Sequence, residues 1–129
     1  MQRSEEMARK LETVQTKEVL NTIYAVDEKG VGGANHKYTI LHAKENEEVP
    51  ANLTTITFQT GARRDPDSIS GVLDPDLLEI VRDRLKGFQE GDFATDDNAK
   101  ALEHVEKALH YMNQRVEKRI ERNVLGTLS

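Results

Sequence analysis

The spacing of the hydrophobic residues along the sequence changes near the middle of the chain. In the first half, β-branched and aromatic residues gather in three short runs, Asn21–Val26, His36–Ala43 and Leu53–Thr60. Such runs are typical of strands. The segments between them are rich in glycine, proline, asparagine and charged residues, which favour turns. The first half therefore predicts a three-stranded antiparallel meander.

The second half changes to the period of an α-helix. Apolar residues recur every three or four positions over Pro75–Gln89, and again over roughly 25 residues that follow Thr95. Asp74 and Thr95 are suitable N-caps, and the short link between the two stripes predicts an antiparallel hairpin. The apolar residues of the second predicted helix form a stripe that is longer than the first predicted helix can cover. We therefore expect part of this stripe to contact another subunit.

These patterns organise the chain as one domain, residues 1–129, with three parts. Residues 1–17 are expected to form an N-terminal arm or short amphipathic helix, residues 18–71 a β portion, and residues 72–129 a helical hairpin. The expected fold class is α+β, with a small antiparallel sheet followed by a long antiparallel helical hairpin. A chain of 129 residues has a modest core, so we expect a homo-oligomer that buries more surface.

Composition narrows the classes of function. The net charge of −5 disfavours long nucleic acids, which are held by broad basic surfaces. Two or three arginines gathered in one pocket can still hold a small diphosphate. The sequence has no cysteine, which excludes a thiolate nucleophile and is compatible with a reducing cytoplasm. It also shows neither a secretory signal nor a long apolar run, so we expect a cytoplasmic protein without a membrane partner.

Catalytic and metal-binding motifs are missing from the sequence. His104 and His110 lie six residues apart, about 240° around a helix, so they cannot chelate one metal from the same face. Gly30, Gly32 and Gly33 precede a strand and lack the pattern of a phosphate-binding loop. We therefore expect a protein that is not an enzyme and that uses no metal and no cofactor.

Aromatic, amide and guanidinium groups are the candidate binding chemistry. Phe88 ends the first predicted helix and Asn98 begins the second, so the hairpin brings both to one end. There an adenine can stack on Phe88 and be read at its edge by Asn98. Spacing alone favours the simpler alternative, in which Phe88 is a core residue and Asn98 a solvated one. For Arg115 and the arginines after it, the simpler alternative is a solvated helix face.

Several stretches share their order and spacing with a known family. They are Tyr24-x-Val26-Asp27, Gly32–Tyr38, Thr57-Phe58-Gln59-x-Gly61, Asp83–Gln89, Gly91–Ala94, Asn98-Ala99-x-Ala101-Leu102 and Glu106-x-Ala108-Leu109-x-Tyr111-Met112-Asn113-x-Arg115. In these residues the chain resembles the phage Thoeris anti-defence sponges of the first class. The same hairpin occurs in phage sponges that sequester cyclic oligonucleotides of CBASS immunity. The resemblance runs from about Val19 to Thr127.

The resemblance implies a sponge that binds and sequesters cyclic ADP-ribose isomers, the glyco-cyclic ADP-ribose immune signals, without cleaving them. Activation of the Thoeris effector in the infected bacterium would thereby be blocked. Phe88, Asn98 and Arg115 would share this ligand with a basic residue at Arg63 or Arg64. Because Asn98 and Arg115 lie about 25 Å apart along a helix, Arg115 would come from a second, antiparallel chain. The implied assembly is a homodimer or a homohexamer of three dimers.

The C-terminal residues are candidates for a second pocket, which in hexameric members of the family holds cyclic tri- or dinucleotides. The candidate residues are Arg119, Arg122, Gly126 and Thr127. Asn123 and Leu125 stand where the family commonly has glycine and glutamate, and a plain helix C-cap is an equal alternative. Other functions stay open: a sponge mainly for cyclic di- or trinucleotides, an enzyme that cleaves the signal, or a helical interaction or virion-assembly protein without a small ligand.

Overall fold

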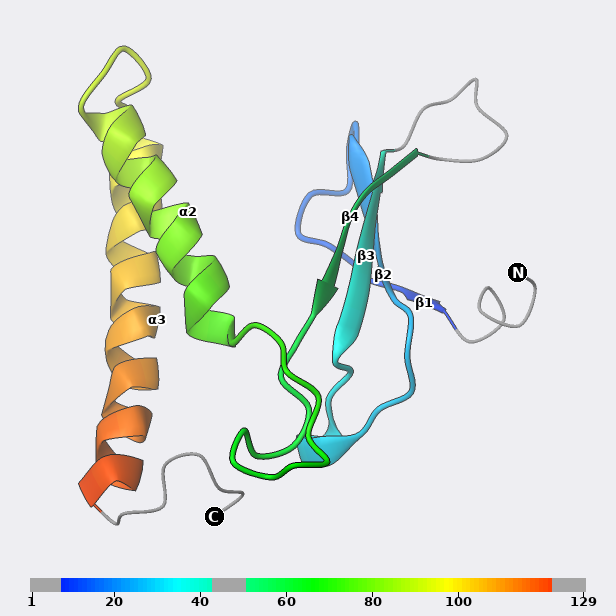
Figure 1. Ribbon diagram of the computed structural model, residues 1–129. Coiled ribbons are helices and arrows are strands. Elements are labelled where there is room, and N and C mark those ends of the chain that lie inside the picture. Colours follow the sequence, from blue (N-terminus) through cyan, green and yellow to red (C-terminus); the bar gives the residue numbers. More distant parts are fainter. Residues whose placement is uncertain (1–7, 43–50, 122–129) are drawn as a thin grey trace. The chain divides into compact units, whose positions relative to one another are not determined.

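The computed structural model describes residues 8–42 and 51–121 of the chain (Figure 1). They group into two compact units, one with the strands and Ile69–Gly71, the other with Gly61–Ser68 and both long helices. The α+β fold class is confirmed, because a four-stranded antiparallel sheet precedes a helical hairpin. The division of residues 1–129 as a single domain stays a prediction.

The sheet has the strand order β1-β2-β3-β4, with neighbouring strands antiparallel. Its unit contains β1 (Arg9–Lys10), β2 (Asn21–Ala25), the short 3₁₀ helix η1 (Val31–Gly33), β3 (Lys37–His42) and β4 (Ala51–Thr57). The three predicted runs correspond to β2, β3 and β4, with shifted ends. Strand β1 was not predicted, and the helical alternative for the arm was wrong over residues 8–17, which contain no helix. A two-residue strand is too short to show any alternation of polar and apolar side chains.

A buried asparagine fixes the loop between β2 and β3. Asn35 is only 8% exposed. Its Nδ2 donates to the carbonyl oxygen of Asp27 at 2.7 Å, and its Oδ1 accepts from Arg9 Nη2 at 2.7 Å. The Asp27 carboxylate accepts the backbone N–H groups of His36 and Lys37. Since a buried polar group without a partner is costly, these bonds hold β1, the loop and the start of β3 together.

The second unit contains the helices α2 (Asp74–Gln89) and α3 (Asp96–Glu121), which form an antiparallel hairpin (Figure 1). The predicted cap at Thr95 is confirmed, because its Oγ1 accepts the Asn98 backbone N–H at 3.0 Å. The predicted N-cap at Asp74 was wrong, because the N-cap of α2 is Leu73, whose backbone N–H donates to Asp76 Oδ2 at 2.8 Å. In the part of the chain that the structure describes, no helix has the length and apolar character of a membrane span.

Few side chains are buried within one chain. Among the residues whose burial the structure describes, Ala25 is the buried hydrophobic residue, and neither α2 nor α3 contains a buried position. Large apolar side chains are open instead: Ile80 is 58% and Ile120 55% exposed. Because apolar burial is the main favourable term in folding, this pattern favours association with further copies. The homo-oligomer itself stays a prediction.

A glycine-to-alanine exchange at Gly71 tests the close packing beside β4. A Cβ at Gly71 would lie 2.5 Å from the Thr57 carbonyl oxygen and 2.7 Å from the Gln59 nitrogen. We expect Gly71→Ala to lower the free energy of unfolding by about 2 kcal/mol or more, because backbone atoms must shift. Chemical denaturation at fixed protein concentration measures this change.

Gly87→Ala is the matched control. A Cβ at Gly87 meets no atom within 4 Å, and the residue lies inside α2. We expect this variant to gain about 0.5–1 kcal/mol of stability, since alanine is the better helix former. Equal stability of the two variants would contradict the described packing at Gly71.

Candidate ligand-binding site

Two aromatic rings are in contact at the link between α2 and α3. The rings of Phe88 and Phe93 lie edge to face with 6.3 Å between their centroids. The Arg84 guanidinium carbon lies 5.3 Å from the Phe88 ring centroid, a cation–π distance. Phe88 is half-buried and Phe93 is 73% exposed. This end of the hairpin therefore offers aromatic surface to a planar ligand.

Asn98 joins the same end of the hairpin. Its Nδ2 donates to the carbonyl oxygen of Phe93 at 3.0 Å. A carbonyl oxygen can only accept, so this bond fixes the side-chain amide with Oδ1 directed away from it. The link is held further by the Thr95 N–H, which donates to Gln89 Oε1 at 3.1 Å. Phe88 and Asn98 thus share Phe93 as a neighbour, and Asn98 Oδ1 suits a donor such as an exocyclic amine.

Arg115 lies far from this end within one chain. It is exposed on α3, and the 17 positions after Asn98 amount to about 25 Å of helix. Arg119, one turn further on, is partly buried. The other second-pocket candidates, Arg122, Gly126 and Thr127, lie outside the described residues.

The loop arginines belong to the same compact unit as the helices. Arg63 and Arg64 are exposed on the segment Gly61–Ser68. The segment is shaped by tight turns: the Asp65 N–H donates to the Ala62 carbonyl oxygen at 2.9 Å, and the Ser68 N–H to that of Asp65 at 3.1 Å. Both arginines are therefore presented by a turn, the kind of segment that commonly carries binding residues.

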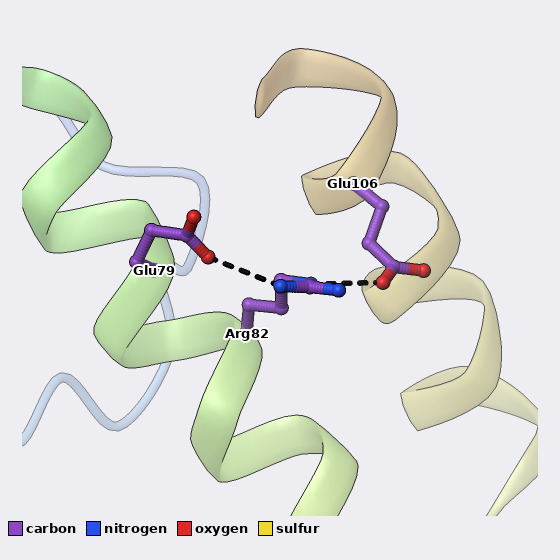
Figure 2. Close-up of polar contacts among 3 residues, drawn as sticks. All are labelled: Glu79, Arg82 and Glu106. Carbon is purple, nitrogen blue, oxygen red and sulfur yellow. Dashed lines mark hydrogen bonds and ion pairs between the residues drawn. The ribbon is translucent and has the colours of Figure 1, made fainter. Parts of the chain in front are cut away.

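An ion-pair cluster joins the two helices midway along the hairpin (Figure 2). Arg82 Nε donates to Glu106 Oε2 at 2.9 Å, and its Nη1 lies 3.4 Å from Glu79 Oε1. The hydrogen bond that Arg82 donates to Glu106, followed by the one that it donates to Glu79, raises the pKa of Arg82. The Arg82 and Glu106 side chains are 38% and 43% exposed, so the pair contributes little net stability in water. It does mark which face of α3 lies toward α2.

Two grooves of the hairpin are lined by side chains of both charges. A groove of about 350 Å³ is lined by Glu79, Arg82 and Glu106 among other residues, and one of about 630 Å³ by Glu103, Glu106 and Lys107 among others. The cations in these linings form ion pairs with the neighbouring glutamates. Neither lining includes Phe88, Asn98 or Arg115, so the candidate site coincides with neither of these two grooves.

Sequence reasoning missed two residues at this site. Phe93 was assigned only to the link between helices, and Arg84 was not considered. Arg84 precedes Phe88 by four positions, the spacing at which side chains of one helix face meet, so this contact could have been found. The ring contact of Phe93 depends on the path of the link, which residue spacing does not fix. Within the described ranges, no cluster of three or more histidine, aspartate or glutamate side chains could hold a metal ion.

Comparison with known proteins places this hairpin in a family. Residues 51–117 match the family described as "Acb2/Tad1, hairpin domain". The chain is also 34% identical over 98 residues to the protein "Thoeris anti-defense 1" of Bacillus phage SBSphiJ7. That alignment covers 76% of this chain and 64% of the phage protein. The matched segment contains α2, the linking residues and most of α3, and the chain therefore belongs to the Acb2/Tad1 hairpin-domain family.

Proposed function

We propose that this protein is a phage anti-defence sponge that binds cyclic ADP-ribose-type immune signals and releases them unchanged. By holding the signal, it keeps a Thoeris effector of the infected bacterium inactive. The observation that carries the proposal is the end of the hairpin, where Phe88 and Asn98 flank Phe93. The phage relative, named for Thoeris anti-defence, supports the same role.

Each proposed binding residue has one task. Phe88 stacks the adenine, and the Oδ1 atom of Asn98 accepts its exocyclic amine. Arg115, with Arg63 or Arg64, holds the diphosphate through charge-assisted hydrogen bonds. Because about 25 Å of helix separates Asn98 from Arg115, one ligand reaches both only if Arg115 belongs to a second chain. The proposed assembly is a homodimer, or a homohexamer of three dimers.

A sponge needs slow release and no turnover. Stacking and charge-assisted hydrogen bonds give a slow dissociation rate, and no reacting group has to be poised for proton transfer. This chemistry matches the groups at the hairpin end, an aromatic pair, an amide and a guanidinium. We therefore propose a binding protein rather than an enzyme that cleaves the signal.

Two further functions stay predictions. A second pocket for cyclic di- or trinucleotides would use Arg119 with residues beyond Glu121, outside the described chain. A helical interaction or virion-assembly protein without a small ligand would need no open aromatic surface at the link. The 73% exposure of Phe93 and the half-burial of Phe88 favour the ligand-binding proposal over this alternative.

Calorimetry followed by recovery of the ligand tests the proposed function. We expect tight binding when the protein is titrated with 1″–3′ or 1″–2′ glyco-cyclic ADP-ribose. Chromatography after heat denaturation should return the ligand unmodified, because the proposed role of the site is binding without proton transfer. A changed ligand would identify an enzyme. Binding of cyclic trinucleotides alone would indicate that the protein is instead a sponge for the CBASS signals.

Mixed variants test whether two chains build one site. We expect Phe88→Ala and Arg115→Ala each to weaken binding about tenfold or more, since base stacking and charged hydrogen bonds are each worth 1–3 kcal/mol. Lys107→Ala removes an exposed cation of α3 outside the proposed site, and its dissociation constant should stay within about twofold of wild type.

Co-refolding the Phe88→Ala and Arg115→Ala chains should restore part of the binding. A heterodimer has one intact site and one doubly altered site, so random pairing returns about a quarter of the wild-type capacity at wild-type affinity. Calorimetry of the mixture measures this capacity. If the mixture binds no better than its components, Arg115 acts within its own chain or outside the site.

A further inference from the structure

A chain of hydrogen bonds connects the last residue of α2 to the side-chain amide of Asn98. Gln89, the last residue of α2, accepts the Thr95 N–H on its Oε1 atom at 3.1 Å. Thr95 Oγ1 accepts the Asn98 backbone N–H at 3.0 Å, and Asn98 Nδ2 donates to the Phe93 carbonyl oxygen at 3.0 Å. Both Gln89 and Asn98 are half-buried. The link between the helices is therefore fastened to α2 at one side and to the amide of Asn98 at the other.

The bond to Gln89 acts on the peptide group next to the one that orients Asn98. The Thr95 N–H belongs to the peptide group between Ala94 and Thr95. The Phe93 carbonyl belongs to the preceding peptide group, and the two groups share the Cα atom of Ala94. Because each peptide group is planar, fixing one restricts the rotation of its neighbour. Gln89 thus restrains the carbonyl to which the Asn98 amide is bound.

The orientation of the Asn98 amide decides which purine edge it matches. With Nδ2 bound to a carbonyl oxygen, the amide offers one acceptor, Oδ1, and its remaining N–H. This pair is complementary to adenine, whose exocyclic amine donates while a neighbouring ring nitrogen accepts. Hypoxanthine has a keto oxygen in place of the amine, so two acceptors would face each other at Oδ1. Guanine has the same keto oxygen and meets the same obstacle.

Rotation of the amide by half a turn would remove this selectivity, because the N–H groups would then face the keto oxygen. The rotated amide places Oδ1 against the Phe93 carbonyl oxygen, so a hydrogen bond is lost and two acceptors repel each other. A carbonyl that is free to turn aside would tolerate the rotation. A carbonyl restrained through the neighbouring peptide group opposes it, so selectivity depends on how firmly the link is held.

We propose that Gln89 is a positioning residue that makes the site select adenine over purines with a keto oxygen in place of the amine. The proposal rests on the proposed function, in which Asn98 reads the base, and it adds the residue that fixes the direction of that reading. Gln89 acts through Thr95 and the link rather than by touching the ligand. Nucleotides of guanine and hypoxanthine, which carry the same phosphates, are rejected at the base.

Paired titrations of the wild-type protein measure the selectivity. Calorimetry compares 1″–3′ glyco-cyclic ADP-ribose with its hypoxanthine counterpart, in which a keto oxygen replaces the amine. We expect a dissociation constant about tenfold to a hundredfold higher for the hypoxanthine ligand, the discrimination that a well-placed amide provides. Equal binding of both ligands would overturn the selectivity and leave the sponge function standing. Binding of neither ligand would overturn the sponge function, and the selectivity with it.

Substitutions at Gln89 test the positioning role through the ratio of the two dissociation constants. Gln89→Met keeps the length of the side chain without a strong acceptor, and we expect the ratio to fall about threefold or more because the adenine ligand binds less tightly. Gln89→Glu keeps an acceptor oxygen, so its ratio should stay within about twofold of wild type, although its charge weakens the binding of both anionic ligands. Gln89→Ala repeats the test if Gln89→Met loses helix by circular dichroism.

Gln15→Met is the matched control. Gln15 Oε1 also accepts a backbone N–H, that of Lys17 at 2.8 Å, but it lies between β1 and β2 in the compact unit that contains the sheet. Its ratio should equal that of the wild-type protein. A purely structural role of Gln89 would weaken the binding of both ligands alike and leave the ratio unchanged in Gln89→Met. That result, or a lost selectivity in Gln89→Glu, would overturn the positioning role.

Discussion

The rise of the α-helix is the constraint on which the proposed binding site depends. Helix α3 runs without interruption from Asp96 to Glu121, so a residue near its start and one near its end stay apart in every single chain. Asn98 and Arg115 are separated by about 25 Å of helix, which is more than one small nucleotide can span. One ligand could contact both residues only if a second α3 helix lay beside the first in the opposite direction. The poor burial of side chains within one chain agrees with that requirement.

Local contacts order the residues that one chain would contribute to the proposed site. The end of α2, the link and the first turn of α3 are joined by the hydrogen bonds of Thr95, Gln89 and Asn98 and by the contact of Phe88 with Phe93. This arrangement orders an amide and two rings before any ligand binds, which lowers the entropic cost of binding. The aromatic pair and the amide are the groups that the proposed ligand would meet at this end of the hairpin.

Much of the fold could be predicted from the period of the apolar residues. The long stripes identified α2 and α3, and the cap at Thr95 followed from the preference of backbone N–H groups for a hydroxyl oxygen. Strand β1 could not be predicted, because two residues carry no period and their pairing depends on β2. The hydrogen bonds that join Arg9, Asn35 and Asp27 could not be predicted either, since only the folded chain brings these residues together.

The candidate site was predictable to a different degree at each residue. The meeting of Phe88 and Asn98 at one end follows from any antiparallel hairpin with a short link. The roles of Arg115 and of the loop arginines were implied by the family resemblance, because spacing gives only their distances along the chain. The ring of Phe93 needed the structure, since the path of a link is set by contacts rather than by sequence period.

Native mass spectrometry of the wild-type protein with glyco-cyclic ADP-ribose tests whether the proposed binding site exists only between two chains. One chain has a mass of 14.6 kDa, so monomers and dimers separate clearly, and the mass of each bound ligand can be counted on each species. We expect one intact ligand per chain on dimers or larger even-numbered assemblies and none on monomers. Ligand bound to monomers with comparable affinity would contradict it.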